Sequence, residues 1–383
     1  MALTKNFGFG PDEQMVRDQA RRFLREGFGI EALRKLVASD HREAYEGAAP
    51  PAVWDQSLWA QMVELGWTGL GVPEDAGGVG MKTIAVAALA EELGRVALPS
   101  PLTATLVATM VLRAAGATAW MTRIAQGEAA TLACTNPMGS WELTDTDVQA
   151  MPDGDGVVLN GTAAFVQDAA KATIVVVAAR GPRGLGLYAV PMDAPGLDVA
   201  PDRIVDLTRD QATLTFGGVR VAPEGIVAAP GEAVAALERA LPAILVVVAA
   251  DLCGAAEWQL QTTVDYAKVR VQFERPIGFF QAVKHPIVDM MLAVDRARSL
   301  LYAAACAVDH EPGDAMRLAR MAKAAACEAG AYCSDRSVQL HGGIGFTWEC
   351  DVHIYFKRQK HSEALYGDAA FQRSKLAALL DAA

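Results

Sequence analysis

Apolar and polar positions follow two different periods along the chain. Between Asp12 and about Gly127, apolar residues recur every three or four positions, as in "DEQMVRDQARRFLRE" and "MKTIAVAALAEELGRVAL". This spacing predicts amphipathic helices. From Glu128 to about Ala229 the apolar runs become short and rich in β-branched residues, as in "ATIVVVAAR", with turn residues between them, which predicts strands. Long helical runs return beyond Gly231.

The order of these patterns predicts a mainly α protein with a middle β domain. We expect an N-terminal helical domain over residues 1–127 and a small antiparallel β-barrel or sandwich over residues 128–229. A C-terminal four-helix bundle is expected over residues 230–383. A chain of 383 residues is long enough to bury a large pocket between such parts.

Charge and composition exclude several classes of function. The net charge is −11 and the basic residues are scattered, so we expect no nucleic-acid partner. The longest apolar run, Ala240 to Ala250, is roughly half the ~20 residues needed to cross a bilayer, which predicts a buried helix and no membrane span. The six cysteines occur without a CxxC pair, and the N-terminus lacks the apolar segment of a signal peptide. We therefore expect no metal site and a cytoplasmic protein.

A glycine cluster, Gly342-Gly343-Ile344-Gly345, is a first candidate for binding chemistry. Without a Cβ, glycines let backbone N–H groups approach a phosphate closely. Taken alone, such a cluster equally marks an ordinary turn or helix start, so its surroundings have to decide between the two readings.

Four separated stretches together resemble the flavin-dependent acyl-CoA dehydrogenases, in order and spacing, along nearly the whole chain. They are "LWAQMVELGWTGLGVPEDAGGVG" (58–80), "VVLNGTAAFV" (157–166), "YAKVRVQFERPIGFFQAVKH" (266–285) and "QLHGGIGFTWECDVHIYFKRQ" (339–359). The resemblance implies a helical domain, a β domain and a four-helix bundle that enclose FAD and a fatty acyl-CoA thioester.

One group of matching residues belongs, by this resemblance, to the ADP half of an FAD bound mainly to a neighbouring subunit. Arg270 matches the residue that pairs with the pyrophosphate. The other matching cofactor contacts are Phe273, Gln281, Gln339, Gly342 and Gly343. Glu274 stands where the family usually has glycine, and its charge weakens the positive potential offered to phosphate.

A second group, which would hold the flavin ring of the chain's own FAD, departs from the family pattern. The usual Thr-Glu-Pro-Gly-Ala-Gly-Ser-Asp loop reads Thr135 to Trp141 here, keeping Thr135 and Ser140 as candidate contacts but losing the acidic residues. The usual Trp-x-Thr reads Phe165-Val166-Gln167. Phe165 is able to pack on a ring and Gln167 to donate a hydrogen bond, although both also suit an ordinary strand with a buried aromatic.

The resemblance also implies a carboxylate that removes the proton alpha to the thioester carbonyl. Many members carry this Glu where Tyr366 stands, and others carry it on the first bundle helix, where Ile244 stands. A phenol with an ordinary pKa of about 10 is a poor base near pH 7.

Asp251 is the tentative candidate for the base. It is the one charged residue between Arg239 and Glu257, on the same helical face as Ile244 but about 10 Å further along the axis. A carboxylate inside an apolar helix is costly unless it is paired or functional. A structural, hydrogen-bonded role is the alternative. Glu363 is a weaker candidate, and His361 is expected on a solvated face.

These observations lead to three functional hypotheses. The first is an acyl-CoA dehydrogenase that forms oligomers, acts on a bulky or unusual acyl-CoA and passes electrons to an electron-transfer flavoprotein. The second is a non-catalytic partner subunit, since some bacterial relatives that act on steroid side chains and rings resemble α2β2 assemblies of two homologous chains. The third is a flavin oxidase or monooxygenase on the same fold.

Overall fold

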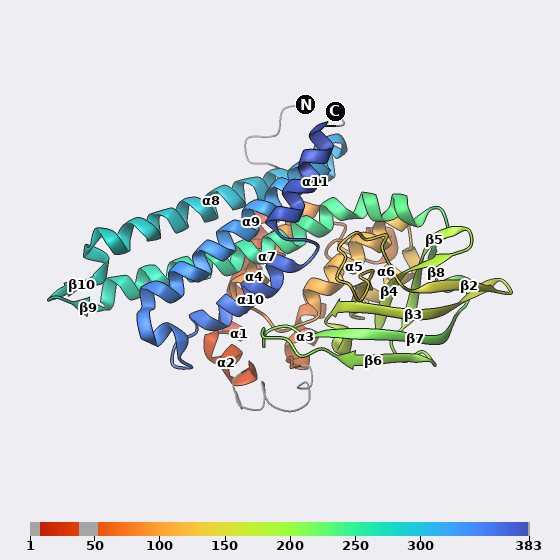
Figure 1. Cartoon of the computed structure of the whole chain (residues 1–383), viewed down its shortest axis with the longest axis horizontal. Coiled ribbons are helices and arrows are strands. Elements are labelled where there is room, and N and C mark those ends of the chain that lie inside the picture. Colours follow the sequence, from red (N-terminus) through yellow and green to blue (C-terminus); the bar gives the residue numbers. More distant parts are fainter. Residues whose placement is uncertain (1–7, 38–52, 382–383) are drawn as a thin grey trace.

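The computed structural model describes residues 8–37 and 53–381, in which one group of helices precedes a sheet in sequence and another follows it, and the sheet lies at one end of the molecule (Figure 1). The helices that precede the sheet are α1 Pro11–Gly27, α2 Ile30–Val37, α3 Gln56–Glu64, α4 Thr83–Arg95, α5 Leu102–Ala115 and α6 Thr118–Ala125. Asp55 caps α3, because its carboxylate accepts hydrogen bonds from two backbone N–H groups of the first turn.

The sheet has eight strands among the described residues, in the order β6-β7-β3-β2-β4-β5-β8, with β1 also paired to β4. The strands are β1 Ala130–Ala133, β2 Gln149–Asp153, β3 Gly156–Gln167, β4 Ile174–Gly181, β5 Gly184–Pro191, β6 Leu197–Pro201, β7 Gln211–Val221 and β8 Ile226–Ala228. Most pairs are antiparallel, but β1 runs parallel to β4. The 40 residues between these two strands hold the β2–β3 hairpin, which gives the chain room to return in the same direction.

Five helices follow the sheet and form the C-terminal bundle (Figure 1). They are α7 Ala233–Val269, α8 Gln281–His310, α9 Pro312–His341, α10 Val352–Ala364 and α11 Ala369–Asp381. A short hairpin, β9 Val271–Gln272 and β10 Arg275–Pro276, joins α7 to α8 at the end of the molecule opposite the sheet. The prediction of a mainly α protein with a middle sheet is confirmed.

The buried apolar residues form two main cores. The larger core joins the N-terminal helices to α7, α8 and α9, so both helical groups share one interior. A second core lies within the sheet. By length and composition α7 would pass as a membrane span, yet 72% of its apolar 18-residue window is buried inside the protein. This helix is the centre of the bundle, as the apolar run Ala240–Ala250 predicts.

Two glycines let α4 and α7 cross with their backbones in contact. A Cβ on Gly94 would lie 2.1 Å from the carbonyl oxygen of Asp251, and a Cβ on Gly254 would lie 1.9 Å from that of Glu91. Real Cβ atoms essentially never approach other atoms so closely. The crossing therefore requires glycine on both helices.

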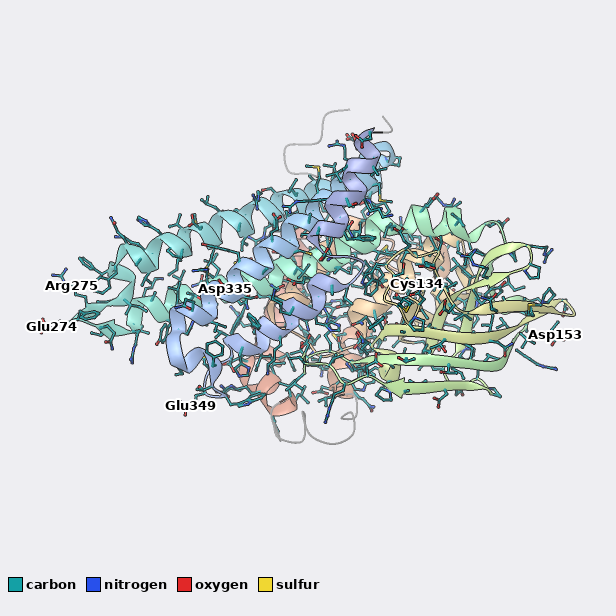
Figure 2. The ribbon with its side chains drawn as sticks, viewed as in Figure 1. Cys134, Asp153, Glu274, Arg275, Asp335 and Glu349 are labelled. Carbon is teal, nitrogen blue, oxygen red and sulfur yellow. The ribbon has the colours of Figure 1, made fainter. Side chains whose placement is uncertain are left out.

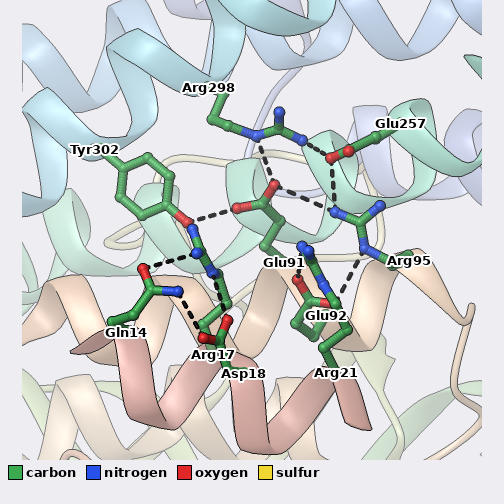
Figure 3. Close-up of polar contacts among 10 residues, drawn as sticks. All are labelled: Gln14, Arg17, Asp18, Arg21, Glu91, Glu92, Arg95, Glu257, Arg298 and Tyr302. Atoms are coloured by element: carbon green, nitrogen blue, oxygen red, sulfur yellow. Dashed lines mark hydrogen bonds and ion pairs between the residues drawn. The ribbon is translucent and has the colours of Figure 1, made fainter. Parts of the chain in front are cut away.

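Charged side chains connect α1, α4, α7 and α8 beside this crossing (Figure 3). The buried carboxylate of Glu91 accepts hydrogen bonds from Arg298 Nε at 2.7 Å and from the Tyr302 hydroxyl at 2.6 Å. Glu92 pairs with Arg21 of α1 at 2.7 Å. Because the buried carboxylates have cationic partners, the network fixes the N-terminal helices on the bundle without leaving an unpaired buried charge.

Candidate active site

A groove of about 580 Å³ lies between the sheet and α10, and we call it the ring-side groove. The end of β3, the segment between β6 and β7, and α10 supply its walls. Its lining includes Trp141, Phe165, Val205, Phe356 and His361. A mainly apolar groove of this volume fits a cofactor-sized ligand with a planar ring.

Phe165 lies in this groove because β3 is irregular there. The pairing of β3 with β7 shifts register between Ala163 and Val166, and Phe165 has a φ of 58°. A left-handed backbone is costly for a bulky residue and is typically kept where it serves a site. The bulge changes the direction of the Phe165 side chain relative to a regular strand.

Gln167 and His361 meet at the edge of the groove. His361 Nε2 lies 2.6 Å from Gln167 Oε1, and Gln167 Nε2 donates to the carbonyl of Phe165 at 3.0 Å. Burial lowers the pKa of His361 to about 4, so this imidazole is neutral at pH 7. The expectation of a solvated face for His361 holds only in part, because the residue is half-buried, lines the groove and bonds to β3.

The loop from Thr135 to Trp141 also reaches the groove, despite its departure from the family sequence. The carbonyl of Thr135 accepts a hydrogen bond from the backbone N–H of Ala164 at 2.9 Å, which ties the loop to β3 next to Phe165. The backbone N–H of Ser140 donates to Asn136 Oδ1 at 3.3 Å. The structure thus brings four predicted residues together at one place: Thr135, Ser140, Phe165 and Gln167.

Tyr366 lines a small cavity of about 20 Å³ that shares Leu365 with the groove. Its ring packs on Trp141 with centroids 5.3 Å apart, and its φ is 57°. Burial raises the pKa of the Tyr366 hydroxyl above its ordinary value, so the phenol stays protonated. Asp168 and Arg209 line the same cavity, and each retains one buried polar atom without a partner, Oδ2 and Nε respectively.

Asp251 does not face this cavity as a free carboxylate. Oδ2 accepts from Arg209 Nη2 at 2.7 Å and from Ser362 Oγ at 3.1 Å, while Oδ1 accepts from Arg358 Nη2 at 2.5 Å. Burial alone would raise the pKa of Asp251, but the two arginines outweigh it and hold the pKa below its ordinary value. These contacts weigh against Asp251 as a proton acceptor and favour the structural alternative.

The predicted ADP-side residues lie in two other places. Arg270 ends α7, and Phe273 and Gln281 lie on the hairpin and the start of α8, at the end of the molecule where Figure 2 labels Glu274 and Arg275. Gln339 lines a pocket of about 420 Å³ that shares Val205, Phe356 and Lys357 with the ring-side groove. The structure therefore does not bring Arg270 and Phe165 of one chain together.

The turn after α9 holds the predicted glycines. Gly342 has φ 67° and ψ −145°, a conformation that only glycine adopts readily. A Cβ on Gly343 would meet no atom of the chain within 4 Å. The backbone conformation therefore accounts for glycine at Gly342. Packing within this chain does not account for glycine at Gly343.

Comparison with known proteins agrees with this architecture. The family model described as "Acyl-CoA dehydrogenase, N-terminal domain" matches residues 10–128, and the model for the C-terminal domain matches residues 236–380. The acyl-CoA dehydrogenase IpdE2 of Mycobacterium tuberculosis is 34% identical over 359 residues, covering 93% of each chain. The chain belongs to the acyl-CoA dehydrogenase family.

Two solved structures of this family show the same fold. A variant of the Tcur3481–Tcur3483 steroid ACAD is 30% identical, with a TM-score of 0.83 over 97% of this chain and 98% of that chain. The ChsE4–ChsE5 complex from Mycobacterium tuberculosis is 26% identical, with a TM-score of 0.84 over 100% of this chain and 99% of that chain. Each of these names joins two proteins.

Acyl-CoA dehydrogenases are FAD-dependent flavoproteins, and the residues of this chain fit the cofactor. Phe165 and Trp141 offer aromatic surface to a flavin ring, and Gln167 offers an amide beside it. Lys357 and Arg203 contribute positive charge along the same groove. FAD would supply a hydride acceptor at this place.

Sequence reasoning missed His361, Asp168 and Arg209. His361 is surrounded by charged residues, in "FKRQKHSEA", so its pattern indicates a solvated helix face. One sequence signal existed, because the apolar Leu365 follows His361 by four residues, the spacing of one helical face. Arg209 lies in a connecting segment, whose contacts the helical and strand periods do not reveal.

Proposed function

We propose that this chain carries out FAD-dependent α,β-dehydrogenation of an acyl-CoA thioester to the trans-2-enoyl-CoA, as part of an oligomer. One observation carries the proposal of an oligomer. The ring-side groove lies between the sheet and α10, whereas Arg270 lies at the hairpin end of the molecule, so we expect a site that uses both to combine two chains.

The surface near Arg270 supports this arrangement. Val269 and Phe273 are 74% and 84% exposed, and Val271 and Phe279 are also exposed on the same hairpin. Exposed apolar side chains gathered in one place are typical of a surface that another chain covers. In the proposed assembly this hairpin reaches the ADP half of an FAD whose ring lies in the groove of a neighbouring chain.

Within the proposed site, the residues of this chain bind, orient and exclude water. Phe165 and Trp141 pack on the ring, and the bond between Gln167 and His361 fixes the amide at the groove. The buried side chains around Tyr366 keep water from the acyl group. The identity of the proton acceptor stays a prediction, and the two arginines on Asp251 weigh against that residue.

A non-catalytic partner subunit is the second candidate, and a specific observation favours it. Asp251 is locked between Arg209 and Arg358, and the position of the usual Glu holds Tyr366, whose hydroxyl stays protonated. In that case a homologous chain in an α2β2 assembly would supply the base. The paired names Tcur3481–Tcur3483 and ChsE4–ChsE5 among the similar structures support this form of assembly.

The finer parts of the proposal concern the substrate, the electron acceptor and the compartment. We propose a bulky, ring-containing acyl group such as a steroid-derived one, supported by the steroid ACAD among the similar structures. An electron-transfer flavoprotein would accept the electrons, and the protein would work in the cytoplasm.

Two measurements test the proposal. The absorbance of bound flavin gives the number of FAD molecules per chain, for the chain alone and after co-expression with a homologous partner. Anaerobic mixing with a straight-chain or a steroid-derived acyl-CoA then follows the loss of the oxidised flavin absorbance. Bleaching of the chain alone supports the active enzyme, bleaching only with the partner supports the second candidate, and no bleaching in either case refutes both.

A further inference from the structure

Side-chain hydrogen bonds connect the ring-side groove to the strand at the sheet edge. His361 Nε2 lies 2.6 Å from Gln167 Oε1, and Gln167 Nε2 donates to Gln211 Oε1 at 3.0 Å. Gln211 Nε2 then donates to Asp202 Oδ2 at 2.8 Å. We call these four residues, His361, Gln167, Gln211 and Asp202, the amide chain.

Two groups that are able only to accept hydrogen bonds fix the direction of the amide chain. The carbonyl oxygen of Phe165 contacts the amide of Gln167, so the contacting atom must be its NH2 group and Oε1 must face His361. The carboxylate of Asp202 contacts the amide of Gln211, so the NH2 group of Gln211 must lie there. Neither amide is able to flip without placing two oxygens against each other.

The direction of the amide chain determines the protonation of His361. Since Gln167 Oε1 only accepts, His361 Nε2 must carry the hydrogen. Burial is the main reason that the imidazole stays neutral at pH 7, with a pKa of about 4, and Arg209 and Arg358 act in the same direction against the opposing Asp206 and Asp168. A neutral ring with hydrogen on Nε2 has a bare lone pair on Nδ1.

Because His361 lines the groove, this lone pair is the acceptor that its ring retains for a ligand there. Among residues 8–37 and 53–381, none donates a hydrogen bond to His361 Nδ1, although the residue lines the groove beside Phe165. An acceptor in a partly apolar groove selects a ligand edge that presents N–H and disfavours an edge that presents only carbonyl oxygen.

We infer that His361 is a cofactor-positioning residue whose Nδ1 accepts a hydrogen bond from a ring N–H of the flavin in the ring-side groove. The inference rests on the proposed placement of the ring in that groove. Asp202, which directly precedes the groove residue Arg203, then reinforces the His361 tautomer through Gln211 and Gln167.

Nitrogen NMR on the full chain tests the inference directly. Ring-labelled histidine gives signals from only six residues, and the signal missing in His361→Phe identifies His361. We expect a protonated Nε2 and an unprotonated Nδ1 without FAD, and a shift of the Nδ1 signal when FAD binds. A hydrogen on Nδ1, an imidazolium at pH 7, or an unmoved Nδ1 signal in the FAD-bound protein would each overturn the inference.

Flavin affinity provides a second test that does not depend on activity. His361→Phe keeps an aromatic ring but removes the acceptor, so FAD should bind about 2- to 12-fold more weakly, as for the loss of one hydrogen bond. Gln167→Leu removes the acceptor that faces His361 Nε2 and should release the tautomer preference in the NMR spectrum. His310→Phe, at an exposed histidine of α8, is the matched control and should leave affinity unchanged.

Phe165→Leu separates failure of the inference from failure of the proposed function. If Phe165→Leu weakens FAD binding while His361→Phe does not, the ring lies in the groove and the inference is wrong. If neither variant changes the affinity, the proposed placement of the ring is wrong and the inference fails with it.

Discussion

Replacing Asp251 by Asn should mainly lower the free energy of unfolding, because we expect the residue to stabilise the fold and not to act as the catalytic base. The side-chain oxygen of Asn still accepts a hydrogen bond from one arginine, but its NH2 group faces the other arginine. The variant also lacks the negative charge that pairs with Arg209 and Arg358. The side chains of all three residues are at most 4% exposed, so water does not replace the lost partner. Removing one partner of a buried ion pair costs about 3–5 kcal/mol.

This loss is large enough to measure by two methods. Urea unfolding should show the free energy of unfolding reduced by about 3–5 kcal/mol, out of the roughly 5–15 kcal/mol typical of folded proteins. With an unfolding entropy of about 2.1 cal/mol/K per residue, the melting temperature should fall by roughly 4 to 6 °C for a chain of this length. Asp265→Asn is the matched control: it makes the same change on α7 at a side chain 61% exposed, and should stay within about 0.5 kcal/mol.

The pH dependence gives a further check on the same pair. The folded-state pKa of Asp251 lies below its unfolded value, so its stabilisation is present above the ordinary carboxyl range and is lost as pH falls through the lowered pKa. The difference between wild type and variant should therefore shrink in acid. A variant of unchanged stability whose flavin reduction by acyl-CoA falls about 10²- to 10⁴-fold would refute this reasoning and make Asp251 the base.

Three further predictions concern other parts of the molecule. Gly254→Ala places a methyl group against a backbone carbonyl of α4 and should cost at least about 1–3 kcal/mol in urea unfolding; an unchanged midpoint would contradict the close crossing. Burial, reinforced by the charge of Asp168, raises the pKa of Asp210 to about 7, so the free energy of unfolding should fall as pH rises from about 4 to 7. Asp210→Asn should reduce this pH dependence, and an equal pH dependence in the variant and the wild type would argue against the raised pKa. Arg270→Ala should weaken FAD binding by about 2 kcal/mol and so lower FAD occupancy, whereas Arg275→Ala on the same hairpin should not. Equal FAD occupancy in the two variants would exclude Arg270 from the site.

The sequence predicts the helices and the main strands well, because their apolar periods are long. It misses β2 and β6, five residues each, whose side chains are mostly exposed and therefore show no alternation toward a core. The mainly α fold with a middle sheet nevertheless follows from the order of the patterns, since the apolar faces of both helical groups and of one side of the sheet are buried in one shared core.

The site is less accessible to sequence reasoning than the fold. Asp251 inside an apolar helix correctly indicates a carboxylate that needs partners, but the partners come from a connecting segment 42 residues earlier and from α10, 107 residues later. The left-handed backbones of Phe165 and Tyr366 are equally invisible, because neither residue type signals a positive φ. Such features depend on contacts between distant segments, which one sequence does not display.

The length of α7 has a consequence for the evolution of such a protein. Nineteen residues of rigid helix, about 28 Å, separate Asp251 at the bundle interior from Arg270 at its tip. In an assembly of the proposed kind, substitutions around the groove and substitutions on the hairpin fall on different sites. After a gene duplication, one copy can therefore lose the groove residues and still contribute its hairpin to the site of the other copy. The two chains then have different functions but keep the same fold.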